Sequence, residues 1–136
     1  MRFMMIMFPG SYTSCEPAHI PDVKHFEEMG KYNDQLRKAG VLLALDGLTP
    51  AATGAQVTFK NGKSKVSDGP FPEAKEVVGG YWIIEVRSRE EALQWASQIP
   101  GTDNERVEVR QVAEISDFDE EIQEKFAESG AKLGKQ

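Results

Sequence analysis

The segment Asp68-Gly69-Pro70-Phe71-Pro72 brings a carboxylate, an aromatic ring and three conformationally special residues into one short turn. Proline fixes its own φ and restricts the residue before it, while glycine accepts conformations closed to other residues, so the turn should be rigid. The charged run 73–76 follows at once. Such a turn could form the wall of a small-molecule site with Asp68 as its carboxylate, or it could simply end a hairpin.

Two side chains of a predicted helix could share acid–base chemistry with Asp68. His25 and Tyr32 are seven residues apart, which places them on one face of a helix. An imidazole exchanges its proton near neutral pH and suits a general base, and a tyrosine hydroxyl can polarise a carbonyl. The alternative for each is structural, as a helix histidine with a fixed hydrogen bond and a core tyrosine whose hydroxyl reaches the rim.

Three further side chains are candidates for contacting a substrate. Asp46 ends an apolar segment and is either a partly buried acid or a turn former. Phe71 supplies the ring of the rigid turn. Arg110 could clamp an anionic group, although an ion pair with Glu85 or Glu108 explains it equally well.

Several classes of site lose their usual support. His19 and His25 are six residues apart, which fits neither helical nor finger spacing for a metal. The chain contains no G-x-G-x-x-G, no G-x-x-x-x-G-K and no G-x-S-x-G. We therefore expect no metal and no cofactor.

Composition indicates one ordinary globular domain that does not bind nucleic acid. The chain has 136 residues, of which 40% are hydrophobic and 28% charged, with a net charge of −6. Phosphate contact needs a basic face, which this balance does not favour. Residues 113–136 hold seven acids and three lysines, and so carry −4 of that charge.

The single cysteine and the apolar start favour a cytoplasmic protein without a membrane anchor. One cysteine, Cys15, cannot form an intramolecular disulfide and fits a reducing compartment. Residues 1–8 are apolar, but Pro9-Gly10 ends the run too early for a membrane span, and no cleavage site follows. This run is predicted to be a buried strand.

Apolar periodicity and turn residues predict the elements in chain order. Asn61-Gly62 is a strong signal for a two-residue type I′ turn, and Ser88 with Glu91 is typical of a helix start. The predicted elements are a strand at 2–8, a loop at 10–21, a helix at 22–39, a strand at 41–45, a hairpin of 56–60 and 63–67, a strand at 81–86, a helix from 88 to 98, a strand at 106–112 and a short acidic helix opening at 116–117.

This order predicts a ferredoxin-like α+β sandwich with an inserted β-hairpin. Two long helices cover only one face of a four-stranded sheet, yet the strands at 2–8, 41–45 and 81–86 are apolar on both faces. A second copy of the chain is the simplest cover for the other face. We therefore expect a homodimer whose sheets face each other.

The rigid turn also carries a resemblance to a known family. Asp68 to Phe71, with Glu73, Lys75-Glu76 and Gly79-Gly80 before an apolar strand, resembles the DGPF branch of the YCII-related proteins. Segments 37–42, 91–96 and 107–110 extend the resemblance over nearly the whole chain. It implies a dimeric α+β barrel with one YCII-related domain over 1–136, in which 113–136 form an acidic C-terminal helix and tail.

The resemblance implies several activities. That superfamily includes small-molecule isomerases, lyases, monooxygenases and ligand-binding proteins, usually with a pocket between the helices and the sheet. DGPF proteins are often associated with extracytoplasmic-function sigma factors. In the YCII relatives a helix histidine and an aspartate form a catalytic pair. The matching histidine position falls near Met29, and His25 is the nearest imidazole, one turn earlier.

Two functions remain open at this point. One is a cofactor-independent isomerase or lyase acting on a small metabolite, with Asp68 and either His25 or Tyr32 transferring protons. The other is a non-catalytic dimer that binds a small ligand, or a regulatory partner such as a sigma factor through its acidic tail. An enzyme needs paired titratable groups in a pocket, whereas a binding protein needs only an apolar cavity. We expect Asp68 and Phe71 to border a cavity shared with His25, Tyr32 or Asp46.

Overall fold

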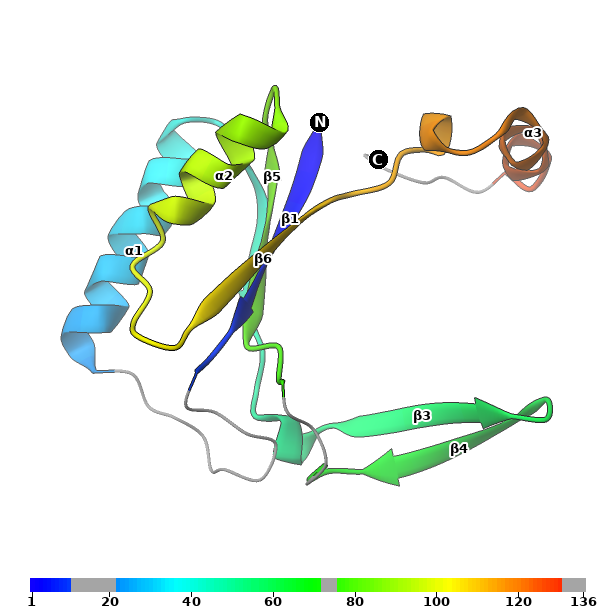
Figure 1. The fold of residues 1–136 in the computed structure, drawn as a ribbon, viewed down its shortest axis with the longest axis horizontal. Coiled ribbons are helices and arrows are strands. Elements are labelled where there is room, and N and C mark those ends of the chain that lie inside the picture. The colour runs from blue at the N-terminus through cyan, green and yellow to red at the C-terminus, as the bar shows by residue number, and fades with distance from the viewer. Residues whose placement is uncertain (11–21, 72–75, 131–136) are drawn as a thin grey trace.

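The structure is a computed structural model that describes residues 1–10, 22–71 and 76–130 (Figure 1). It is an α+β fold. Its elements are β1 (Arg2–Phe8), α1 (Val23–Lys38), β2 (Leu42–Gly47), a 3-10 turn η1 (Ala51–Thr53), β3 (Ala55–Lys60), β4 (Lys63–Asp68), β5 (Gly80–Glu85), α2 (Arg89–Ser97), β6 (Arg106–Gln111), a second 3-10 turn η2 (Ile115–Asp117) and α3 (Glu120–Glu128). Most of the predicted loop at 10–21, with Cys15 and His19, lies outside the described residues.

Every predicted helix and strand is present, and the largest difference is at the last helix. The segment Ile115–Asp117 forms η2, so α3 begins at Glu120 and not at 116–117. Asp119 caps α3 by accepting a hydrogen bond from the Ile122 N–H at 3.0 Å. The second strand also runs two residues beyond its predicted end, through Asp46 to Gly47.

The main sheet has the strand order β2-β5-β1-β6, with all neighbours antiparallel. Its central strand β1 pairs with β5 on one side and β6 on the other, so that Met5 lies opposite both Trp82 and Val109. This is the order of a ferredoxin-like sandwich. Both α1 and α2 lie on one side of the sheet (Figure 1).

Alternation along β1 and β5 places the core between the sheet and these two helices. Every second residue of each strand is buried, and Met5, Ile84 and the α1 residue Leu36 are fully enclosed. The same alternation sends Met4, Ile6, Phe8 and Ile83 to the other side, which we call the open face. These open-face side chains are only partly buried.

The two edge strands of the sheet differ in character. On β2 the pairing with β5 shifts between Leu42 and Ala44, which leaves Leu43 as a bulge residue. On β6 the residues on the open-face side are charged: Arg106, Glu108 and Arg110. Arg106 lies over the Phe8 ring at 4.3 Å and forms an ion pair with Glu76 at 2.9 Å.

The hairpin β3–β4 forms a separate two-stranded sheet that projects away from the main one (Figure 1). Asn61 and Gly62 both have positive φ, 52° and 75°, which confirms the type I′ turn. The following turn contains a cis Gly69-Pro70 peptide and packs against η1. Gly69 is required there for space, because a Cβ would lie 2.6 Å from the Ala51 carbonyl oxygen.

The same substitution at a buried and at an exposed leucine tests where the core lies. Leu36→Ala should lower the free energy of unfolding by about 2–5 kcal/mol, because it leaves a cavity in the core. Leu43→Ala should cost well under about 1 kcal/mol. The exposed fractions of the two residues are 0% and 42%. Urea unfolding measures both, and equal losses would contradict this placement of the core.

Candidate functional site

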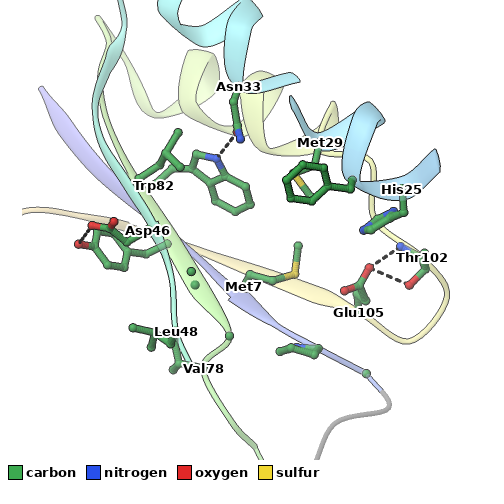
Figure 2. A pocket seen from close by; sticks show the side chains of 18 of the residues that line it. Met7, His25, Met29, Asn33, Asp46, Leu48, Val78, Trp82, Thr102 and Glu105 are labelled. Carbon is green, nitrogen blue, oxygen red and sulfur yellow. Dashed lines mark hydrogen bonds between the residues drawn. The ribbon is translucent and has the colours of Figure 1, made fainter. Parts of the chain in front are cut away.

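A cavity of about 780 Å³ lies between the first half of α1 and the end of the sheet where β1 ends and β5 begins (Figure 2). Its lining is mixed. The apolar part comes from Met7, Met29, Leu45, Leu48, Val78 and Trp82, and the polar part includes His25, Asn33, Thr102 and Glu105.

Helix capping places His25 at this cavity. The Asp22 side chain accepts a hydrogen bond from the His25 backbone N–H at 2.7 Å and so fixes the first turn of α1. The half-buried imidazole lies at the polar end, beside the loop that precedes β6 (Figure 2). There Glu105 Oε1 accepts hydrogen bonds from both the N–H and the hydroxyl of Thr102, each at 2.7 Å.

The indole of Trp82 forms a fixed wall of the cavity. Its Nε1–H donates to Asn33 Oδ1 at 2.8 Å. The Tyr32 ring meets it edge to face, with centroids 6.0 Å apart. Because both contacts come from α1, the helix and the sheet hold the indole in one orientation.

Tyr32 lies behind this wall, and it is not among the residues that line the cavity. It is buried, and its hydroxyl donates to the Trp95 carbonyl oxygen at 2.7 Å. Burial raises the pKa of Tyr32 well above its ordinary value. These contacts give Tyr32 a structural role that joins α1 to α2.

Asp46 borders the cavity but is paired with another residue. Its Oδ2 accepts a hydrogen bond from the Tyr81 hydroxyl at 2.9 Å, across the β2–β5 ladder. The hydrogen bond and then the negative charge of Asp46 raise the pKa of Tyr81. Figure 2 shows the pair on the far side of the strands from Trp82.

The remaining predicted site residues lie elsewhere. Asp68 is exposed at the end of β4 and lines neither this cavity nor the smaller one beside it. Phe71 lines a smaller cavity of about 250 Å³, whose wall shares Leu48, Thr49 and Val78 with the larger one. Arg110 is exposed on the open-face side of β6. Within the described chain, His25 and Asp46 both line the larger cavity, although the Asp46 carboxylate pairs with Tyr81, and Asp68, Phe71, Tyr32 and Arg110 are not among its lining residues.

Several lining residues have no signal in a chemical motif. Trp82 is visible in the sequence only as part of an apolar strand, and Glu105 and Thr102 only as loop residues. Met29 was detectable, because it lies one turn after His25 on the same helix face. Asn33 becomes significant only once α1 is seen against β5.

The fold is thus an α+β sandwich with a cavity between α1 and the sheet. Residues 1–116 match the profile of the YCII-related domain, and the chain belongs to the YCII-related family. The match ends before α3. An uncharacterised protein of Rhizobium meliloti (strain 1021) is 36% identical over 62 residues, which are 46% of this chain and 50% of the relative. The chain thus spans about half the length of the curated relative it matches.

No helix in 1–10, 22–71 or 76–130 is long and apolar enough to cross a membrane. In the same ranges, no three His, Cys, Asp or Glu side chains gather in a way that could hold a metal ion.

Replacing Asp46 tests the carboxylate–phenol pair. In Asp46→Asn the pKa of Tyr81 should fall towards its ordinary value, because the negative charge that favours the protonated phenol is gone. Ultraviolet titration of tyrosinate measures this, and the Tyr81→Phe variant identifies which step belongs to Tyr81. An unchanged titration in Asp46→Asn would show that the pair does not form.

Proposed function

We propose that this protein binds a small metabolite with an apolar, ring-containing body in the cavity between α1 and the sheet. The observation that carries the proposal is the cavity itself. Its volume of about 780 Å³ lies within the range of roughly 300–1,000 Å³ typical of small-molecule sites. Its lining combines apolar side chains with charged and polar ones, among them Asp22, Lys24, His25, Glu28, Asp103 and Glu105, and such sites use polar groups to orient a ligand.

The chemistry of the wall favours a flat, polarisable ligand. Trp82 borders the cavity with an indole held in one orientation, and because it is 6% exposed, a bound ring can contact only part of it. Met7 and Met29 add thioether side chains, which adapt their shape and contact aromatic edges favourably. The polar group of the ligand would then meet His25 and the Thr102–Glu105 loop.

Catalysis at this cavity would rest on His25. It is the one histidine among the described residues, and an imidazole at the end of an apolar cavity suits proton transfer to or from a bound metabolite. Asp46, which faces Tyr81, does not orient it in this structure. An isomerase or lyase activity is therefore a second step of the proposal, and binding is the first.

The pairing of subunits belongs to the same proposal. Met4, Ile6, Phe8 and Ile83 form an apolar centre on the open face, opposite the face that α1 and α2 cover. When one face of a sheet is covered and its other face is apolar, a second sheet is a favourable cover for the apolar face. The segment Asp68 to Phe71 supports a place in the DGPF branch, where the resemblance implies this kind of dimer.

The two tryptophans provide a direct test of binding. In a ¹H–¹⁵N spectrum, aromatic lactones and hydroxyaromatic fragments should shift the indole signal of Trp82, which lines the cavity. The signal of Trp95, which is not among the lining residues, serves as the internal control. Met29→Trp should reduce the shift, because the larger side chain occupies part of the cavity. Fragments that move only Trp95, or none that move Trp82, would contradict the proposal.

A second variant separates catalysis from binding. His25→Gln should reduce turnover of a bound fragment by about 10²–10⁴-fold, because an amide cannot transfer a proton, while the Trp82 shift on binding is kept. Tyr32→Phe is the control: it should lower the free energy of unfolding by about 1 kcal/mol and leave turnover unchanged. Wild-type protein that binds without turnover would establish a binding protein and remove the enzymatic step.

Sedimentation equilibrium at micromolar concentration tests the subunit pairing. The wild-type protein should have twice the mass of the chain, and Ile83→Lys should have the mass of one chain, because a charge cannot be buried between two apolar faces. Val23→Lys, at an exposed position on α1, is the matched control and should remain dimeric. A monomeric wild-type protein would rule out the pairing.

A further inference from the structure

The β3–β4 hairpin exposes an apolar face. Val57 and Phe59 alternate along β3, and Val66 lies directly opposite Val57 on β4, so the three share one side of the ribbon. Their exposed fractions are 51%, 79% and 66%. Two-stranded hairpins are marginally stable in water by themselves, so this face favours a cover.

The C-terminal segment also exposes apolar side chains. Apolar residues follow one another at intervals of four positions here: Phe118, just before α3, and then Ile122 and Phe126 within it. The side chains of Phe118 and Ile122 are exposed. Among the described elements, neither the hairpin nor α3 packs extensively against another helix or strand. Both extend to the open-face side of the main sheet (Figure 1).

The two segments carry opposite charge. The hairpin, from 55 to 68, holds three lysines, Lys60, Lys63 and Lys65, and one acid, Asp68, at the end next to the sheet and away from the Asn61-Gly62 turn. The segment 117–128 holds six acids and one lysine: Asp117, Asp119, Glu120, Glu121, Glu124, Glu128 and Lys125. They also leave the sheet at opposite ends, because the hairpin follows the end of β2, whereas α3 follows the end of β6.

We propose that the hairpin of each subunit docks on the α3 segment of a second copy of the chain. The proposal rests on the face-to-face dimer proposed above. A six-residue strand is about 20 Å long, and stacked sheets lie about 10 Å apart, so the hairpin reaches past the interface to the partner. Val57 and Val66 then cover Ile122 and its neighbours on the partner.

Charge favours docking of the hairpin on the partner's α3 segment over an arrangement in which like segments meet. A two-fold axis can place like segments together, hairpin on hairpin and α3 on α3, or it can cross them. The first arrangement brings three lysines against three lysines and six acids against six acids. The second brings lysines near acids, and opposite charges across an interface favour its formation. Crossing is therefore the favourable choice.

Two single-cysteine variants distinguish these arrangements. In a background with Cys15→Ser, Val66→Cys protein and Ile122→Cys protein are prepared separately, mixed, exchanged and oxidised. The mixture should give a covalent dimer on a non-reducing gel. Either variant alone should give none, because in the crossed arrangement its own cysteines do not meet.

The same samples separate failure of this proposal from failure of the dimer. If sedimentation shows a dimer while covalent dimers form in the single variants and the mixture gives no more of them than the single variants do, the crossed docking is overturned and the sheet pairing stands. A dimer without any cross-link also overturns the docking alone. A monomer overturns both, whereas binding of fragments at Trp82 is measured independently of either.

Reversing charge provides a second measurement on the same contact. Lys63→Glu with Lys65→Glu should weaken dimerisation and reduce the yield of the cross-linked mixture, and combining it with Glu120→Lys and Glu121→Lys should restore both. An unchanged dissociation constant in the first variant, with an unchanged cross-linking yield, would overturn the role of charge and with it the argument for the crossed arrangement.

Discussion

The central strand β1 needs a hydrogen-bonded partner at each of its two edges and a cover for each of its two apolar faces. The rest of the fold follows from this constraint. The edges of β1 are paired with β5 and β6, and one of its faces is covered by α1 and α2. Met5 on that face is fully buried, while its neighbours Met4 and Ile6 emerge on the open face. A strand that is apolar on both sides therefore fixes both the core of one chain and the surface on which a second chain would pack.

The candidate site depends on the same core. Trp82 points to the helix side because β5 is in register with β1, and α1 then holds the indole through Asn33 and Tyr32. The first turn of α1 runs beyond the core contacts, so that His25 borders an open space. The cavity is thus the place where helix and sheet diverge, between a fully packed centre and the sheet end.

The sequence predicted the elements better than it predicted the site. Periodicity and turn residues are local signals, and they identified the order of the elements along the chain, the Asn61-Gly62 turn and the helix that carries His25. The position of Asp68 is a long-range property, because it depends on the direction in which a free hairpin leaves the sheet. Its motif specified the local packing of Gly69 against η1, and no local pattern could relate that turn to α1. Trp82 and Asn33 form a pair across 49 positions, which no spacing reveals.

The bulge at Leu43 has a consequence for solubility. A regular edge strand offers an unbroken row of N–H and C=O groups to which a strand of another molecule can add. The shifted pairing interrupts that row on β2, and the alternating Arg106, Glu108 and Arg110 place charge along β6. Both edges of the sheet are thereby poor templates for strand addition. The sheet therefore resists growth into fibrils through its edges.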